Sequence, residues 1–208
     1  NWVLFNASPD VLQQLQNFPA LQPARALRDT AIRAIVLIDA QIDHTTGLYM
    51  LREKGSPWPI WCTDPVYEDL TRGNPILHLL EHYCGVDRRP LPAGGEPFHP
   101  EGSESLDWQA LPLLSAAPPY SPHRGNPVPG DNVGLTIRDP ATRRRVFYAP
   151  GLAEVDDAVF AAMRNADCVM VDGTFWTDDE MISLGLSTKR ARDIGHLAQS
   201  GPGGMIEQ

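Results

Sequence analysis

The stretch that most constrains the fold of this chain runs from residue 34 to residue 48. It begins with an unbroken apolar run, Ala34 to Ile38, that is rich in β-branched residues. Such a run is typical of a strand that is covered on both faces. Four polar side chains follow before the pattern of a helix begins: Asp39, Gln41, Asp43 and His44. Because loops at the ends of buried strands often carry functional residues, we expect a site here.

Asp43 and His44 are adjacent at this strand-to-helix turn, where a carboxylate oxygen and an imidazole nitrogen can point at one metal ion. Asp43 can instead cap the helix by accepting backbone N–H bonds, with His44 held semi-buried. A carboxylate and histidines that leave open coordination positions form the ligand set of a mononuclear iron(II) centre. The pair also accepts zinc, manganese or copper, so the sequence leaves the metal open.

Residues 39–47 resemble the signature of the metallo-β-lactamase superfamily, in which a core strand runs into His-x-His-x-Asp-His-x-x-Gly. The second half is kept here, whereas Asp39 and Gln41 replace the first two histidines. The resemblance implies an α/β fold, the αβ/βα four-layer sandwich, as a single domain over residues 1–208. In hydrolytic members a hairpin strand ends in an acid that bridges two metals, but here that strand ends in Ala149-Pro-Gly151. A residual metallo-hydrolase is therefore the least favoured function.

Within the superfamily, Gln41-Ile-Asp-His-Thr-Thr-Gly-Leu48 is similar to the branch that acts in the biosynthesis of pyrroloquinoline quinone (PQQ). The resemblance implies an iron- and O2-dependent hydroxylation of the tyrosine of the PQQ precursor peptide, with Asp43 and His44 as catalytic metal ligands. It implies as partners the ribosomal precursor peptide, its peptide chaperone, and PQQ or a late precursor, and it leaves open a homodimer. The alternative is a carrier for PQQ or its precursor that does no catalysis.

Both ends of the chain read as cut, because each lies in an apolar segment. The resemblance then implies a third metal ligand, a histidine beyond Gln208, and a structural zinc on cysteines outside this segment.

Other polar residues are candidates for the same site. The resemblance gives Asp10 the role of orienting metal ligands, although helix capping also explains it. His123 is the candidate for a further metal ligand within the chain, in a proline-rich loop at the mouth of the site. Asp172 follows another predicted strand, and His196 lies in a Gly-His segment that resembles the superfamily's RNA-processing branch. The residues expected to orient ligands or contact substrate are Asp10, Asp39, Gln41, Tyr120, Arg124, Asp172 and His196.

Strands and helices alternate along much of the chain. The predicted strands are Trp2–Phe5, Ala34–Ile38, Trp58–Thr63, Asn132–Ile137, Arg145–Tyr148 and Cys168–Asp172. Capping residues or prolines predict helices that start near Ser8, Asp64, Asn74 and Glu154. In the first helix, with Ser8 as N-cap, Leu12, Leu15 and Phe18 should form the buried stripe. Residues 86–130, rich in proline, glycine and serine, are predicted to form a long loop.

His78-Leu-Leu-Glu81-His82 matches the His-x-x-Glu-His spelling of zinc peptidases. Histidines four residues apart share a helix face and can bind one metal, with the glutamate as a general base. Five residues are a weak signal, and no third ligand follows in an obvious place. We therefore favour an amphipathic helix that exposes these side chains.

Composition excludes several classes of function. A formal net charge of −9 argues against a nucleic-acid partner, which needs clustered lysine and arginine. No stretch approaches the roughly 20 apolar residues of a transmembrane helix, and no signal segment opens the chain, so we expect no membrane insertion. The widely spaced Cys62, Cys84 and Cys168 are predicted to be reduced core thiols of a cytoplasmic protein.

Overall fold

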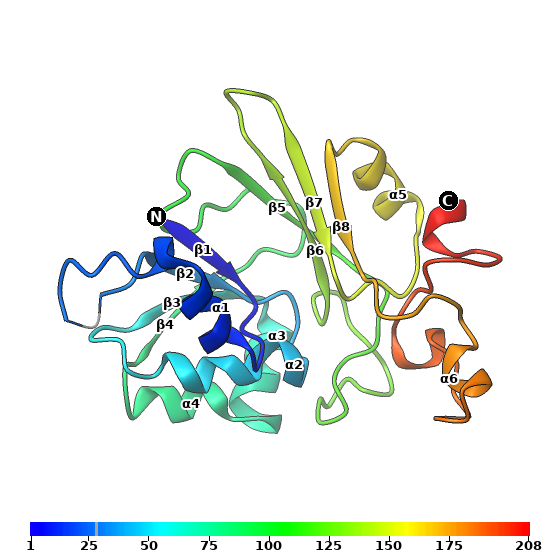
Figure 1. Cartoon of the computed structure of the whole chain (residues 1–208), viewed down its shortest axis with the longest axis horizontal. Helices are drawn as coiled ribbons and strands as arrows, with labels where there is room; N and C mark the ends of the chain where they lie inside the picture. Colours follow the sequence, from blue (N-terminus) through cyan, green and yellow to red (C-terminus); the bar gives the residue numbers. More distant parts are fainter. Residues whose placement is uncertain (28) are drawn as a thin grey trace.

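Two four-stranded sheets pack face to face, with helices on both outer sides, in the computed structural model of this chain (Figure 1). The structure describes residues 1–27 and 29–208. Helices α1 to α4 cover the outer face of the first sheet, and α5 covers the second. The layers are therefore helix, sheet, sheet and helix, which confirms the predicted αβ/βα sandwich.

The first sheet is parallel, and its strand order is β1-β2-β3-β4. These strands are Trp2–Phe5, Ile32–Val36, Trp58–Cys62 and Val86–Pro90. The connecting helices are α1 (Val11–Asn17), α2 (Ile42–Thr45), α3 (Asp64–Glu68) and α4 (Ile76–Glu81). Shorter helical turns extend three of them: η1 (Pro19–Leu21), η2 (Thr46–Leu51) and η3 (Asp69–Gly73).

The central strand β2 is buried on both faces, as its apolar run predicts. Successive side chains on a strand point to opposite faces, so Ile35 and Leu37 pack under the helices. Val36 and Ile38 point the other way and pack against the second sheet. Both faces of β2 are therefore packed. The polar residues Asp39, Gln41, Asp43 and His44 follow at the carboxyl end of this rigid strand.

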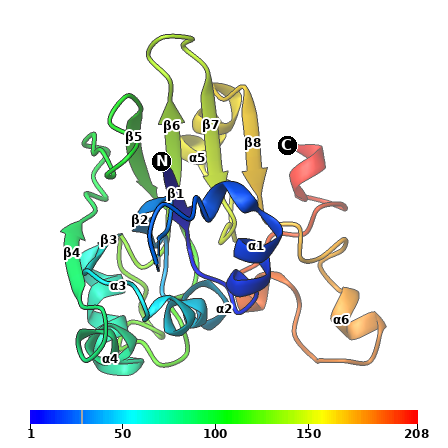
Figure 2. The same ribbon diagram turned by 60° about the vertical axis from the view of Figure 1, so that its left-hand side comes forward.

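The second sheet is mixed, with strand order β5-β6-β7-β8 (Figure 2). These strands are Asp107–Pro112, Val133–Arg138, Arg145–Ala149 and Cys168–Val171. The predicted hairpin is confirmed as β6 and β7. The predicted helix after it is α5 (Asp157–Arg164), capped by Asp156, whose side chain accepts the Val159 N–H. The chain continues through α6 (Glu180–Ser183), η4 (Arg192–Ile194) and η5 (Met205–Glu207).

The prediction of one long loop over residues 86–130 is wrong, because β4 and β5 lie within it. β4 has the charged sequence Val-Asp-Arg-Arg-Pro and lies at the edge of the first sheet, where charged side chains can reach water. Arg89 pairs there with Glu101 at 2.9 Å. Such a strand has no apolar alternation and is recognisable only by its pairing with β3.

Strand β8, which confirms the strand predicted near Cys168–Asp172, is another edge strand, and most of its apolar side chains are exposed. Cys168 is exposed, and Met170 keeps about half of its surface, 53%, open to solvent. The prediction of a core thiol is therefore wrong for Cys168, whereas Cys62 and Cys84 are buried free thiols. The difference arises because β8 has a neighbouring strand, β7, on one side only.

Two details of the predicted helices also differ. Asp10, and not Ser8, is the N-cap of α1, and it forms no side-chain capping bond. Leu12 and Phe18 are exposed, and Val11 is the buried residue of that helix.

His78, Glu81 and His82 are all exposed on or just after α4, so the amphipathic interpretation of that motif is confirmed. No helix in the described ranges is long and apolar enough to cross a membrane.

Candidate metal centre

A cleft of about 450 Å³ lies where the ends of β2, β7 and β8 meet the loop after β5. It contains most of the residues that the sequence marks as site candidates. The members of that set that line the cleft are Asp39, Gln41, Asp43, His44, Arg124, Asp172 and His196. The topology therefore brings together residues from positions 39 to 196.

His44 lies in the short helix α2 and is held by the fully buried carboxylate of Asp39. Its Nδ1 is 2.8 Å from both carboxylate oxygens of Asp39. The Gln41 N–H also donates to Asp39 Oδ1, at 2.9 Å, which fixes the carboxylate. Since Asp39 accepts the Nδ1 proton, Nε2 of the neutral imidazole is left unprotonated, as a metal ligand requires. Of the residues expected to orient ligands, Asp39 is the one that contacts His44, and Asp10 does not.

Burial lowers the pKa of His44, but the hydrogen bond and the charge of Asp39 outweigh it, and the pKa is raised from its ordinary value. The imidazole is therefore a stronger base than an ordinary histidine.

The carboxylate of Asp43 lies near the other ring nitrogen of His44, with Oδ2 3.8 Å from Nε2. Metal bonds to oxygen and nitrogen are about 2.0–2.2 Å long, so two ligand atoms of one ion can be up to about 4 Å apart. The pair therefore fits a single ion. The alternative of a capping aspartate is not realised, because no side chain caps α2. Within residues 1–27 and 29–208, no three His, Cys, Asp or Glu side chains are grouped closely enough to hold a metal by themselves.

His196 forms a second histidine–carboxylate pair in the cleft. Its Nδ1 is 2.5 Å from Oδ2 of Asp172, and Oδ1 of Asp172 accepts the N–H and the hydroxyl of Thr174 at 2.9 and 2.6 Å. The bond to Asp172 raises the pKa of His196. Burial raises the pKa of Asp172, but its bonds lower it by more. The ring of Phe175 contacts His196 edge-on, so the imidazole is fixed with Nε2 available to a bound molecule.

The loop after β5 is attached to the end of β2. The Tyr120 hydroxyl donates to the carbonyl of Ala40, and the Gln41 side chain donates to the carbonyl of Ala116 at 3.3 Å. Burial raises the pKa of Tyr120 to about 12, so the phenol stays protonated. Tyr120 therefore anchors the loop and does not line the cleft, whereas Arg124 does.

Besides Tyr120, two further predicted site residues lie outside the cleft lining. His123 is outside the cleft lining, and its Nδ1 is 2.9 Å from Oδ1 of the buried Asp131, so the structure does not bring it to Asp43 and His44. Asp10 is exposed and also outside the lining.

Asn132 is a cleft residue that the sequence analysis missed; its side chain donates to the Ala116 carbonyl at 3.3 Å. Its position at the start of the predicted hairpin was the only signal.

The place of the bridging acid of two-metal enzymes, just after β7, is taken by Pro150 and Gly151. A Cβ atom on Gly151 would lie 3.4 Å from Asp39 Oδ2 and 3.6 Å from the Asn132 side chain. Gly151 therefore packs closely beside Asp39 and contributes no ligand atom from a side chain. The donor set at this cleft fits one metal ion better than two.

The fold is that of the metallo-β-lactamase superfamily, and a family model described as a beta-lactamase superfamily domain matches residues 1–208. The chain is 65% identical over 207 residues to coenzyme PQQ synthesis protein B of Azoarcus sp. (strain BH72), covering 100% of this chain and 68% of the relative. It is 60% identical over 208 residues to the protein of that name from Methylobacillus flagellatus, again covering 68% of the relative. The chain belongs to the coenzyme PQQ synthesis protein B family.

A solved structure agrees with this assignment. The crystal structure of Zn(2+)-bound PqqB from Methylobacterium extorquens has a TM-score of 0.83 and 28% sequence identity to this chain. The match covers 99% of this chain and 67% of that one. The chain thus spans about two thirds of the length of its relatives.

Proposed function

We propose that the protein acts in the synthesis of coenzyme PQQ as a mononuclear, metal-dependent hydroxylase of the tyrosine in the precursor peptide. The observation that carries this proposal is the Asp43–His44 pair: one oxygen and one nitrogen converge, the imidazole is fixed by buried Asp39, and no bridging acid follows β7. One carboxylate and histidines with open positions suit iron(II), which supplies O2 activation when bound. A third protein ligand, outside the 208 residues, is part of the proposal.

The proposed reaction inserts one oxygen atom of O2 into a ring C–H bond of tyrosine. The second oxygen atom leaves as water, which requires two electrons and two protons from an external reductant. The chain's own residues bind the metal, exclude a second metal and hold protons in the cleft. His196, whose pKa is raised, can hold a proton at Nε2, because Asp172 occupies Nδ1.

The metal and the compartment are part of this proposal. The PqqB of Methylobacterium extorquens binds zinc in its crystal structure. Asp with His accepts zinc as well as iron, so zinc there is compatible with iron as the working metal here. The buried free thiols Cys62 and Cys84 suit a reducing cytoplasm.

Mass spectrometry of the precursor peptide tests the activity. The full-length protein, loaded with iron(II), is incubated with the peptide, its peptide chaperone, a reductant and ¹⁸O2. We expect one heavy oxygen atom to be added to the tyrosine, and none under nitrogen or with the metal-free protein. Binding of the peptide or of PQQ without any change in mass would reject the hydroxylase and favour a carrier.

A further inference from the structure

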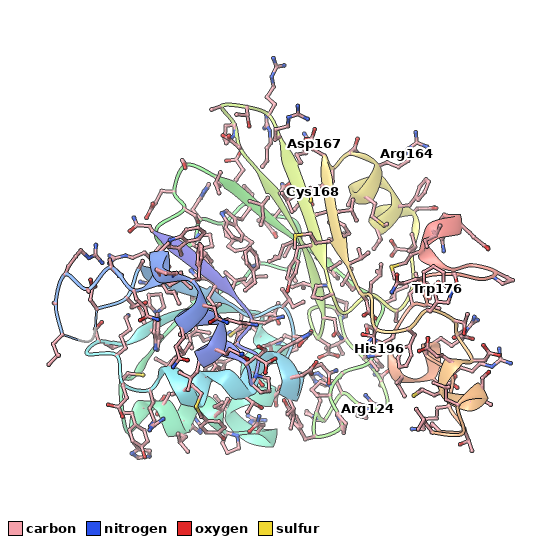
Figure 3. The ribbon with its side chains drawn as sticks, viewed as in Figure 1. Arg124, Arg164, Asp167, Cys168, Trp176 and His196 are labelled. Atoms are coloured by element: carbon pink, nitrogen blue, oxygen red, sulfur yellow. The ribbon has the colours of Figure 1, made fainter. Side chains whose placement is uncertain are left out.

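Arg124 is the only lysine or arginine among the described residues that line the cleft. Three carboxylates, Asp39, Asp43 and Asp172, line it as well. In the described chain none of them, nor any other acid, lies within ion-pair distance of Arg124. Figure 3 labels Arg124 on the loop after β5. A cation that stays unpaired among acids is available to an anionic ligand.

The backbone that carries Arg124 is fixed relative to the candidate metal ligands. The Arg124 N–H donates to the Ser121 carbonyl at 3.2 Å, and the adjacent His123 is bound to the buried Asp131. Tyr120, in the same loop, is bonded to Ala40, which lies just before α2. The loop therefore places Arg124 at the cleft that Asp43 and His44 also line.

The side chain of Arg124 has unused hydrogen-bonding capacity. Its Nη1 donates to the Ala117 carbonyl at 2.5 Å, which orients the guanidinium without neutralising it. The guanidinium carries five N–H groups in a planar fork that matches a carboxylate bidentately. The remaining N–H groups can therefore take both oxygens of one carboxylate.

We propose that Arg124 forms a carboxylate-binding subsite of the cleft and selects substrates or products that carry a carboxylate near the reacting ring. Only the choice of ligand rests on the proposed function: PQQ is a tricarboxylic acid and presents carboxylates on its ring system. A metal ion at Asp43 and His44 would offset the charge of the acids, and Arg124 would then orient the ligand toward that ion.

Isothermal titration calorimetry with the full-length protein tests the subsite, with PQQ and its trimethyl ester as probes. Hydrogen bonds to charged groups predict that Arg124→Gln weakens PQQ binding by roughly 10- to 100-fold. The PQQ affinity of Arg124→Lys, which keeps the charge and loses the planar fork, should lie between those of the unaltered protein and Arg124→Gln. The ester should bind weakly to the unaltered protein and should not distinguish Arg124→Gln from it.

Arg143→Gln is the matched control, because it removes the same charge from the exposed tip of the β6–β7 hairpin. It should leave PQQ affinity unchanged. Equal affinity of Arg124→Gln and the unaltered protein for PQQ, or equal affinity of the acid and the ester, would overturn the subsite. If the unaltered protein binds PQQ through Arg124 but does not hydroxylate the precursor peptide, the proposed reaction is rejected and the subsite stands.

Discussion

The buried carboxylate of Asp39 and the imidazole of His44 form one unit, in which Nδ1 is 2.8 Å from both carboxylate oxygens. Asp39 stands at the first histidine position of the superfamily signature that residues 39–47 resemble. The substitution thus removes a ligand and adds a group that orients the next histidine. This exchange favours a single metal held from one side.

Asp39→Ala should weaken metal binding by about 10- to 100-fold, because His44 loses the partner that fixes its tautomer and orientation. Metal affinity can be measured by competition with a chelator of known affinity. Asp10→Ala is the control, since Asp10 is exposed and forms no side-chain bond in the α1 cap. If both variants bind metal as well as the unaltered protein, Asp39 does not orient a ligand.

Asp43→Ala should abolish both iron binding and tyrosine hydroxylation. Its carboxylate is 78% exposed and caps no helix, so the substitution removes a ligand without removing a structural contact. Iron content after purification and the mass of the peptide give the two readouts, and circular dichroism checks the fold. An unchanged product yield would remove Asp43 from the role proposed for it.

The local sequence predicts the central strand and the Asp43–His44 pair because both depend on residues within one short stretch. The buried apolar run requires a two-sided strand, and the turn after it must expose polar groups. Asp39 was expected among the residues that orient ligands or contact substrate, but the sequence did not pair it with His44. Asp39 was identified as a replaced ligand, and only the fold of the turn shows that its carboxylate lies against Nδ1.

Residues that act over longer separations are harder to predict from sequence. His123 and His196 both lie in loops rich in proline or glycine, and each is bound to an aspartate. The spatial order of β5 to β8 brings only His196 to the cleft. Pairing between distant strands determines which of these loops reaches the cleft. Such pairing also determines the formation of β4, whose charged sequence has no local strand signal.

Asp172→Asn should lower the pKa of His196, because the carboxylate that raises it is replaced by a neutral amide. A histidine pKa that is raised by folding adds stability below the unfolded value of about 6.5, and the contribution is lost as pH rises through the folded pKa. The loss of unfolding free energy on substitution should therefore be larger at pH 6 than at pH 9. NMR titration of the His196 ring and urea unfolding at both pH values test this. Equal losses at the two values would contradict it.

Asp69→Asn should stabilise the protein at pH 8 more than at pH 5. Asp69 is buried, neither carboxylate oxygen has a hydrogen-bond partner, and burial raises its pKa. An acid with a raised pKa costs stability once pH exceeds its unfolded value, and an amide avoids that cost. Thermal unfolding at both pH values measures the difference. Asp10→Asn is the control, because Asp10 is exposed and its side chain forms no capping bond. A destabilised Asp69→Asn at pH 8 would show that the charge is paired.

Gly47→Ala should destabilise the protein by about 1–3 kcal/mol or more, the usual cost of overpacking. A Cβ atom there would lie 2.1 Å from the Ser8 carbonyl oxygen and 2.7 Å from that of Ala7, so backbone must move. The Ala7 N–H donates to the His44 carbonyl at 2.6 Å, and the displacement should therefore reach the metal ligand. The free energy of unfolding, measured with urea, and the metal affinity should both fall. Gly55→Ala has nothing within 4 Å of the new methyl group and should change neither; a stable Gly47→Ala protein with weakened metal binding would separate the two effects.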